Sequence, residues 1–312
     1  MIHPGRPRRL RAVAAAVAVV ALLVGAGAPP AAAAAPYKIG SFRLLHLAVE
    51  NRYYRETSLP PLKAAPPVDD EGVPLFARGG KLYYHPVVLA QRALALLDGY
   101  RQTGDAAYLA GARTVAARIV KESSTANGGR YLPYRFDFAL HNLSNQVMKA
   151  TWWSGMAEGQ ALSVFSRLYA LEGRQADLDV ARSLFTAMQL HGTTGAWVSH
   201  VDADGFLWIQ EFPRSDPDFT LNGFIFALFG LYDYYEETGD LEARRMLLGG
   251  MTTVRHYLPR FRNPGGVSFY CLSHKVTNLK YHNIHVAQLR MLAKMTRHWD
   301  FVTYARRFDA DA

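Results

Sequence analysis

The sequence predicts a mainly helical protein, an (α/α) barrel or toroid of about four helix hairpins with short β-hairpin inserts at one rim. Three observations lead to this fold class. Long segments with apolar residues at helical spacing come in pairs along the chain. A short turn joins the two members of each pair and recurs at similar intervals. Segments of alternating, aromatic-rich sequence separate one pair from the next, as the strands of small hairpins would.

The first 35 residues have the composition of a cleaved export signal. Four arginines precede an apolar run at 12–26, and small residues follow at 29–35. At about fifteen residues the run is short for a membrane span. We therefore predict a signal peptide at 1–35 and a secreted or extracytoplasmic protein with no stable membrane span after cleavage.

In residues 36–80, the pairs Pro60-Pro61 and Pro66-Pro67 argue against regular structure in the middle of the stretch. We expect it to form an N-terminal arm wrapped on the barrel, and we assign the barrel domain to 81–312. This length is sufficient for one large domain with a sizeable core.

The inner helices of the barrel are predicted at 85–102, 155–171, 218–237 and 281–295. Gly104 and Gly239 follow two of them as expected for residues that end a helix, and Asp105 and Asp240 can each cap the helix that comes next. The second helix of each pair would lie in an outer ring.

Strand-like inserts lead the chain into the inner helices. Residues 197–210 alternate around the turn Asp204-Gly205 and predict a hairpin. Segments 129–136 with 147–153, and 267–271, are interpreted in the same way. Because each insert ends where an inner helix begins, their polar residues should gather at one rim, where we expect a binding cleft.

Charge and cysteine content limit the function classes. The formal net charge of +9 includes the four arginines of the signal, and the remaining excess suits an anionic partner. Blocks of basic residues interleaved with aromatics are missing from the sequence, so nucleic acid is not an expected partner. Cys271 is the only cysteine, which excludes an intrachain disulfide, and we expect it to be a small apolar residue at a strand end.

Polar side chains that could do chemistry lie just before or inside apolar helices late in the chain. They are Glu211, Asn222, Tyr270 and Tyr281. Paired tyrosines with a nearby carboxylate suit a reaction in which a proton leaves one face of a sugar ring and another returns to the opposite face. The alternative is that both tyrosines only pack, as many of the chain's tyrosines do.

A tyrosine with a pKa of about 10 is a poor base at neutral pH unless nearby positive charge lowers that value. His274, Lys275 and Lys280 are the local candidates for this charge, and for binding a substrate carboxylate.

Three further features leave alternatives open. Tyr83 and Tyr84 open the first inner helix, where they would either stack on a sugar or simply pack. Asn222 would hydrogen-bond either a backbone turn or a sugar hydroxyl. His282 and His285 share a helix face without a third ligand at metal-site spacing, so we predict that His282 binds substrate and that the protein uses no metal or other cofactor.

Residues 71–308 resemble the D-glucuronyl C5-epimerase family, whose animal members convert glucuronate to iduronate within heparan sulfate precursors. The matching segments run in the family's order over most of the chain after the signal. They are 72–75, 83–86 with 90–91, 153–160, Glu211 with Pro213, 221–223, 230–233, and 281–282 with His285 and 288–289. The resemblance implies an (α/α) barrel, which agrees with the repeat pattern.

The resemblance also implies an active site. The family's glutamate falls on Glu211, its asparagine on Asn222, and its two later tyrosines on Tyr270 and Tyr281. Two family residues are replaced, because a tyrosine of the family is Phe212 here and an arginine is Ser273. We do not expect the chain to contain the additional β-domain of the animal enzymes.

From the resemblance we expect a secreted isomerase of the glucuronyl C5-epimerase type. It would invert C5 of glucuronyl residues in an anionic uronate-containing polysaccharide, such as a heparosan-like glycosaminoglycan. A uronate polysaccharide lyase and a non-catalytic polysaccharide-binding module are the alternatives. The polymer, the export route and the oligomeric state, including a homodimer, stay open.

Overall fold

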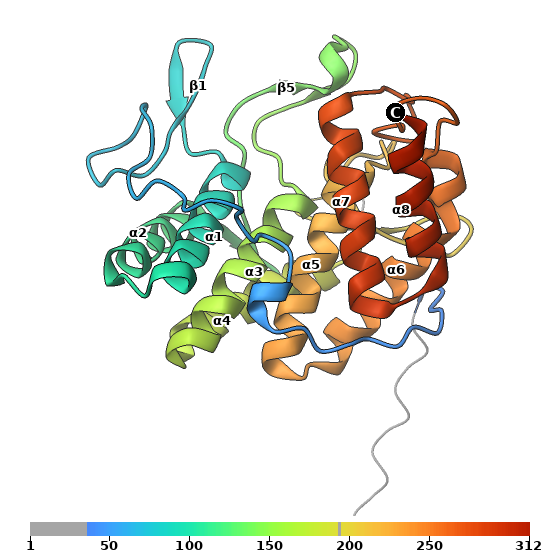
Figure 1. The fold of residues 1–312 in the computed structure, drawn as a ribbon. Coiled ribbons are helices and arrows are strands. Elements are labelled where there is room, and N and C mark those ends of the chain that lie inside the picture. Colours follow the sequence, from blue (N-terminus) through green and yellow to red (C-terminus); the bar gives the residue numbers. More distant parts are fainter. Residues whose placement is uncertain (1–35, 193–194) are drawn as a thin grey trace, which may run out of the picture. The chain divides into compact units, whose positions relative to one another are not determined.

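The structure is a computed structural model that describes residues 36–192 and 195–312, so the predicted signal peptide at 1–35 lies outside the described residues. Eight α-helices in the described part run as four hairpins (Figure 1). They are α1 (Pro86–Thr103), α2 (Ala106–Glu122), α3 (Gly155–Glu172), α4 (Gln175–Gln189), α5 (Leu221–Thr238), α6 (Leu241–Phe261), α7 (Leu279–Thr296) and α8 (Trp299–Asp311).

The turns within the hairpins follow the chemistry that the sequence predicts. The first three inner helices end at Gly104, Gly173 and Gly239, with φ angles of 69°, 65° and 69° in the left-handed region that glycine adopts at low cost. Asp105 and Asp240 then accept hydrogen bonds from the first backbone N–H groups of α2 and α6, which confirms both predicted caps.

The odd-numbered helices form the inner layer, and the order of their contacts confirms the toroid. α1 packs on α3, α3 on α5 and α5 on α7, while each even-numbered helix packs on the partner that precedes it. α3 is buried from 155 to 168 and α5 from 221 to 234 without interruption. A helix that is buried all round belongs to the centre of a domain.

α3 and α5 approach so closely that their contact requires glycine. A Cβ on Gly230 would lie 2.1 Å from the carbonyl oxygen of Gly159, and a Cβ on Gly159 would lie 2.4 Å from the Cα of Ala227. These two glycines bring the backbones of the central helices into direct contact and thereby fix the position of the N-terminal ends that carry the inserts.

Four antiparallel two-stranded sheets make up the inserts. Their strands are β1 (Phe76–Arg78) with β2 (Lys81–Tyr83), β3 (Ser124–Ala126) with β4 (Gly129–Tyr131), β5 (Phe138–Ala139) with β6 (Val147–Met148), and β7 (Ser199–Val201) with β8 (Leu207–Ile209). The hairpin at 197–210 is confirmed.

Two strand predictions are wrong in detail. Segment 129–136 is divided, because β4 pairs with β3 and only a single bridge joins Tyr134 to Trp152. Segment 267–271 forms no strand among the described elements, because its backbone groups bond to several different segments. Phe269 N–H donates to Phe261, whereas Tyr270 N–H donates to Val276.

The chain from 36 to 75 is irregular apart from one 3-10 turn, Val49–Asn51. It crosses the C-terminal ends of the inner helices, where Leu45 bonds to Met295 of α7, Arg52 to Asp233 of α5, and Glu56 to Asp98 of α1. Figure 1 shows the first part of this segment, in dark blue, at the end of the bundle opposite the β1 and β5 inserts, and the rest in lighter blue running past α1 to β1. The predicted boundary at residue 80 falls within the turn between β1 and β2.

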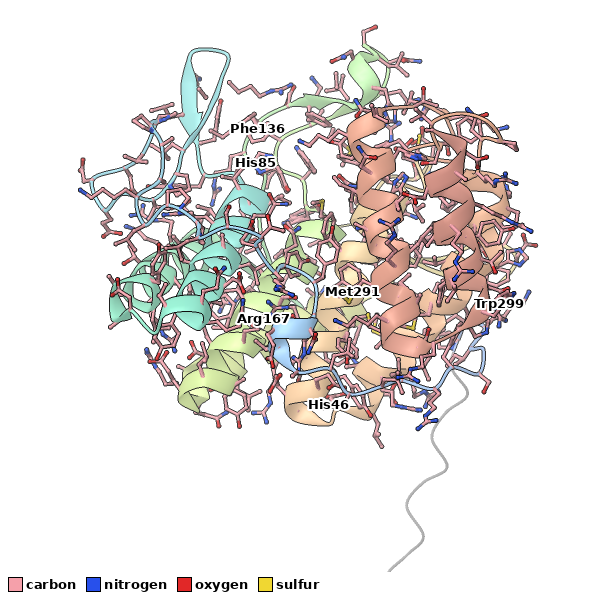
Figure 2. The ribbon with its side chains drawn as sticks, in the orientation of Figure 1. His46, His85, Phe136, Arg167, Met291 and Trp299 are labelled. Atoms are coloured by element: carbon pink, nitrogen blue, oxygen red, sulfur yellow. The ribbon has the colours of Figure 1, made fainter. Side chains whose placement is uncertain are left out.

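An aromatic cluster packs between the N-terminal end of α1 and the inserts at 129–153. His85, the N-cap of α1, lies edge-on to Tyr134 at a ring distance of 4.9 Å, and Phe136 lies beside it (Figure 2). Tyr134 in turn stacks on Trp152 with ring centroids 3.8 Å apart. Burial lowers the pKa of His85 to about 4, so this ring is neutral and packs as an aromatic. Among the described residues, no helix combines the length and the apolar character needed to cross a membrane.

Candidate active site

An open cavity of about 340 Å³ lies beside the N-terminal end of α7. One wall comes from β5 and the 3-10 turn that follows it, Leu140–Asn142, and the other comes from the loop before α7 and the first turn of that helix. The lining residues are Phe138, Ala139, Leu140, His141, Asn142, Phe212, Tyr270, Val276, Thr277, Asn278 and Tyr281.

The structure brings together the three residues predicted to be catalytic. The Tyr270 hydroxyl donates to Glu211 Oε1 at 3.1 Å, and the rings of Tyr270 and Tyr281 lie 4.5 Å apart. Tyr270 is held by its backbone, since its carbonyl accepts from the N–H of Leu221, the first residue of α5. Tyr281 occupies the first turn of α7 behind the cap Asn278. These contacts bring a carboxyl group and two phenols together, and both tyrosines line the cavity.

The carboxyl group of Glu211 is buried where the chain leads from β8 toward α5, and Gly223 makes room for it. A Cβ at position 223 would lie 2.1 Å from Glu211 Oε2. The carboxyl group therefore lies against the first turn of α5, where the helix dipole and the Gly223 N–H favour its ionised form.

Burial dominates the protonation of this group. Desolvation raises the pKa of Glu211 to about 8, although the Tyr270 hydroxyl and the Gly223 N–H act in the opposite direction. Desolvation and the Glu211 charge raise the pKa values of both Tyr270 and Tyr281. A carboxyl group that titrates near neutral pH and is hydrogen-bonded to a phenol can exchange protons with it during a reaction.

The two family positions that differ in this chain lie at and near the cavity. Phe212 lines it and stacks on Phe138, with ring centroids 5.7 Å apart. Ser273 is exposed and donates to the carbonyl oxygen of Pro217 at 2.6 Å. Neither residue supplies a proton carrier or a cation to the cavity.

Other predicted site residues lie apart from the cavity or have partners already. Tyr83 packs on Phe136, and Tyr84 donates to Asp69 at 2.8 Å; both line a different, smaller cavity near α1. Lys280 is exposed, and Lys275 lies over the ring of Phe269. The cations expected to lower a tyrosine pKa therefore do not do so here, because the tyrosine pKa values rise.

His282 is buried and accepts from the N–H of Ser268 at 3.0 Å, which makes it part of the packing between α7 and the preceding loop. His274 Nδ1 lies 2.6 Å from Asp218 Oδ1. Asn222 is buried on α5, where its Oδ1 has no hydrogen-bond partner in the part of the chain that the structure describes. Whether these groups bind substrate stays a prediction.

Two residues of this region were not predicted from the sequence. Tyr134 is fully buried, and the charges of Glu211 and Glu158 contribute, after desolvation, to raising its pKa. His141 lines the cavity edge-on to Tyr270, with ring centroids 5.8 Å apart. Tyr134 belongs to a run of aromatic residues of the kind that usually packs in a core, and His141 lies between two short strands and is part of no motif. The sequence therefore does not indicate that either residue belongs to the site.

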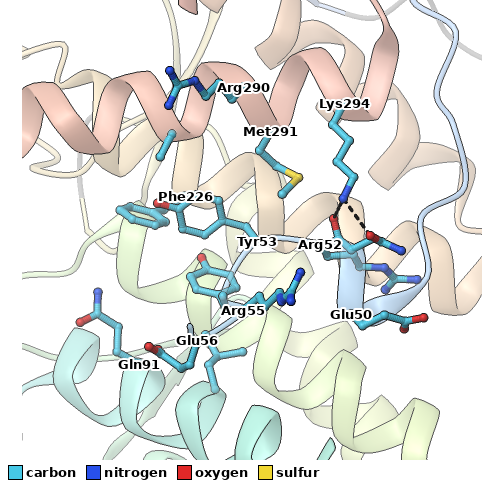
Figure 3. Close-up of a pocket in the computed structure, with 14 residues that line it drawn as sticks. Glu50, Arg52, Tyr53, Arg55, Glu56, Gln91, Phe226, Arg290, Met291 and Lys294 are labelled. Atoms are coloured by element: carbon cyan, nitrogen blue, oxygen red, sulfur yellow. Dashed lines mark hydrogen bonds between the residues drawn. The ribbon is translucent and has the colours of Figure 1, made fainter. Parts of the chain in front are cut away.

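A larger cavity of about 580 Å³ lies between α1, α7 and the arm (Figure 3). Its lining carries several basic side chains, among them Arg55, Arg290 and Lys294. Lys294 bonds to Asn51, and Arg290 pairs with Asp309. None of the predicted catalytic residues lines this cavity, so we assign the chemistry to the smaller one beside α7.

Comparison with known proteins identifies the family. Residues 126–310 match the family model described as D-glucuronyl C5-epimerase C-terminus. A D-glucuronyl C5-epimerase of Caenorhabditis elegans is 25% identical over 197 residues, which are 57% of this chain and 31% of that protein. An uncharacterized protein of Methanocaldococcus jannaschii is 24% identical over 178 residues, 56% of each chain. The chain thus spans just under a third of the first relative and just over half of the second.

Solved structures support the fold. A cellobiose 2-epimerase from Bacillus thermoamylovorans aligns with a TM-score of 0.52 at 11% identity, covering 72% of this chain and 59% of that one. A sugar epimerase from a ruminal bacterium aligns with a TM-score of 0.52 at 15% identity, covering 73% and 59%. At this level of identity the likeness shows a shared helical architecture.

Proposed function

We propose, from the premise that this chain belongs to the D-glucuronyl C5-epimerase C-terminus family, that it is a carbohydrate epimerase. It inverts C5 of glucuronyl residues in an anionic, heparosan-like polysaccharide outside the cytoplasm. The observation that carries the proposal is that Tyr270 and Tyr281 line one cavity while the Tyr270 hydroxyl donates to the carboxyl group of Glu211.

The chemistry follows from the hydrogen bond between Tyr270 and Glu211. Breaking the C5–H bond sends the proton to the Tyr270 oxygen while the phenol proton passes to the Glu211 carboxylate. The electron pair delocalises into the uronate carboxyl group as an ene-diolate. A proton delivered to C5 on the opposite face, which we assign to Tyr281, completes inversion. The Tyr281 phenolate formed in this step is then neutralised by the proton held on Glu211, passed on through Tyr270 or water, so that atoms and charges balance over the cycle.

This route explains how a tyrosine with a raised pKa can act at neutral pH. The abstraction step requires no free phenolate, because the Tyr270 phenol passes its own proton to Glu211 as it receives the one from C5. Glu211, with a pKa near 8, is a stronger base than an ordinary carboxylate and still ionises in part at neutral pH.

A lyase is the second candidate, and Phe212 favours it. Removal of the same C5 proton followed by loss of the O4 substituent cleaves the polymer and needs no proton donor on the opposite face. Phe212 has no proton to give, and it lines the cavity where the family has a tyrosine.

The deciding experiment incubates the protein, without its first 35 residues, with heparosan in deuterated water. Deuterium at C5 together with iduronate supports the epimerase. Ultraviolet-absorbing unsaturated ends support the lyase. Binding to immobilised heparosan without exchange would contradict both enzymes and indicate a binding module.

Tyr270→Phe and Tyr281→Phe should each reduce C5 hydrogen exchange by at least about 100-fold, because each removes only a hydroxyl that carries a proton. Tyr304→Phe, on α8 away from the cavity, is the matched control and should keep the parent rate. Circular dichroism should show an unchanged fold in all three variants. Near-normal exchange in both cavity variants would rule out the assignment.

A further inference from the structure

Four potential metal ligands meet beside the candidate active site. His141, Asp218, Cys271 and His274 each offer one donor atom, and these four atoms lie within 4.8 Å of one another. They come from three separate loops: the turn after β5, the segment before α5 and the loop before α7. Asp218 and Cys271 are buried at 1% and 0% exposure, and the two histidines are partly buried.

The separations of these donor atoms fit a tetrahedral ion. Zinc bonds of about 2.0–2.3 Å at tetrahedral angles put neighbouring N, O and S donors about 3.3–3.6 Å apart. Cys271 Sγ lies 3.5 Å from His141 Nε2 and 3.9 Å from His274 Nδ1. Asp218 Oδ1 lies 3.2 Å from His141 Nε2 and 2.6 Å from His274 Nδ1. Shifts of a few tenths of an ångström per group would complete the shell.

The surroundings hold the donors in place. The Thr220 hydroxyl donates to Asp218 Oδ2 at 3.0 Å, and such outer contacts orient ligands in metal sites. Both oxygens of this carboxylate face the cluster, since Oδ2 lies 3.1 Å from His141 Nε2 and Oδ1 lies 2.6 Å from His274 Nδ1. Backbone bonds from Leu272 to Phe219 and from Ser273 to Asp218 join two of the loops.

The backbone beside the ligands is strained in all three loops. His141, Phe219 and Lys275 have φ angles of 53°, 55° and 51°. A non-glycine residue in this region costs of order 1–3 kcal/mol and persists where the surroundings impose it. Each strained residue is therefore one of the four ligands or lies next to one, as expected if the three loops are bent toward a shared centre.

We propose that His141, Asp218, Cys271 and His274 bind one zinc ion. Two imidazoles, a thiolate and a carboxylate form a donor set that zinc accepts, and four protein ligands make a closed site of the structural kind. The ion would tie the turn after β5 to the two loops that carry Phe212 and Tyr270, and so fix the width of the cavity. This inference does not depend on the reaction proposed above.

The sequence places these ligands far apart, so the spacing rules for zinc motifs do not reveal them. The expectation of no metal rested on His282 and His285, and these two residues instead bond to Ser268. The site therefore emerges from the tertiary structure alone.

Metal content and spectroscopy test the site directly. The untagged protein, purified without its first 35 residues and dialysed against zinc, should retain one zinc per chain. Substitution with cobalt should give visible bands of tetrahedral intensity and a thiolate-to-cobalt charge-transfer band. Because Cys271 is the only cysteine of the chain, that band can arise from no other residue and should vanish in Cys271→Ser.

His274→Gln and Cys271→Ser should each lower zinc affinity by at least about 100-fold, exceeding the typical outer-shell effect. His46→Gln, an exposed histidine on the arm, is the control and should bind as the parent does. A chelator should lower the melting temperature of the parent and leave that of Cys271→Ser unchanged. The proposal is overturned if the parent binds no zinc, or if His274→Gln and Cys271→Ser, folded by circular dichroism, retain it as the parent does.

Discussion

At the scale of single residues, Glu211 shows how a sequence builds a titratable group for use near neutral pH. Its carboxyl group is removed from water, which raises its pKa, while Tyr270 and the N-terminus of α5 keep the ionised form accessible. Gly223 is part of this arrangement, because any larger residue would occupy the space of Oε2. The position of the Glu211 carboxyl group therefore depends on Gly223, a residue of the following helix.

Phe212 is the residue at which this chain differs most directly from the family's active site. In Phe212→Tyr we expect the rate of C5 inversion to stay within about threefold of the parent, because Tyr270 and Tyr281 already supply the proton carriers. The added hydroxyl would lie where the Phe212 ring now packs against Phe138 and Trp152. This crowding favours a slight loss of rate over a gain.

Parent and Phe212→Tyr should be compared side by side by deuterium incorporation at C5, with Phe212→Leu as the control for lost ring stacking. A large gain in inversion from an inactive parent would refute the proposed roles of the two tyrosines. It would also identify the natural protein as a binding module.

At the scale of elements, the contact between α3 and α5 controls where the inserts lie. Gly159 and Gly230 allow the two backbones to touch, and both helices then present their N-terminal ends to the same rim. Displacing one helix would move Glu211 and Tyr270 relative to each other, since Gln210 bonds to Gly155 at the start of α3 and Tyr270 bonds to Leu221 at the start of α5.

Gly230→Ala should reduce the free energy of unfolding by about 3 kcal/mol, because its Cβ would meet the Gly159 carbonyl at 2.1 Å and a backbone would have to move. Gly111→Ala is the control, since its Cβ would lie 3.4 Å from Leu96, an ordinary contact. This control should be neutral or gain up to about 1 kcal/mol from helix propensity. Denaturant titration measures both values, and equal stability of the two variants would show that the close contact is not needed.

At the scale of the whole molecule, residues 45–56 of the N-terminal arm connect the first inner helix, α1, to the last, α7. Arg52 pairs with Asp233 at 3.2 Å and Glu237 at 2.6 Å, and Arg167 of α3 pairs with the other oxygen of Asp233. These charges are nearly all buried, so removing one partner would leave an uncompensated charge in the interior. The inner helices α1 and α7 are thereby linked through residues 45–56, with the larger cavity between them.

Buried carboxyl groups also give the whole molecule a pH-dependent stability. Burial raises the pKa values of Glu158 and Glu211 to about 8, against 4.5 for an exposed glutamate. Between these values the folded state holds protons that the unfolded state has lost, so stability falls as pH rises and levels off above about 8. His85 and His285, with pKa values lowered to about 4 and about 3, have the opposite effect, but only below 6.5.

The free energy of unfolding should therefore fall between pH 6.5 and pH 8. In Glu158→Gln the free energy of unfolding should decline less steeply with pH. At pH 8 it should exceed that of the parent by up to a few kcal/mol, since one pKa unit corresponds to about 1.4 kcal/mol. The substituted amide can still accept from the Leu132 N–H that bonds to Glu158 Oε1. Chemical denaturation at several pH values measures the slope, with the exposed Glu50→Gln as control. Identical slopes in all three proteins would contradict the assigned burial effect.

The sequence by itself determined the helix pairs, their turns and the insert hairpin at 197–210. These features depend on local rules, namely the apolar period of a helix, the left-handed glycine at its end and the Asp-Gly turn of a hairpin. Its resemblance to a known family also implied that Glu211, Tyr270 and Tyr281 form one group.

Only the tertiary structure decided which side chains share a cavity and what their surroundings do to them. The raised pKa of Glu211 depends on burial, and the separation of Tyr84 and His282 from the cavity depends on partners distant in sequence. His141 meets Asp218 across 77 positions and Cys271 across 130. Contacts of this kind arise from how eight helices pack in three dimensions, and no local pattern in the sequence encodes them.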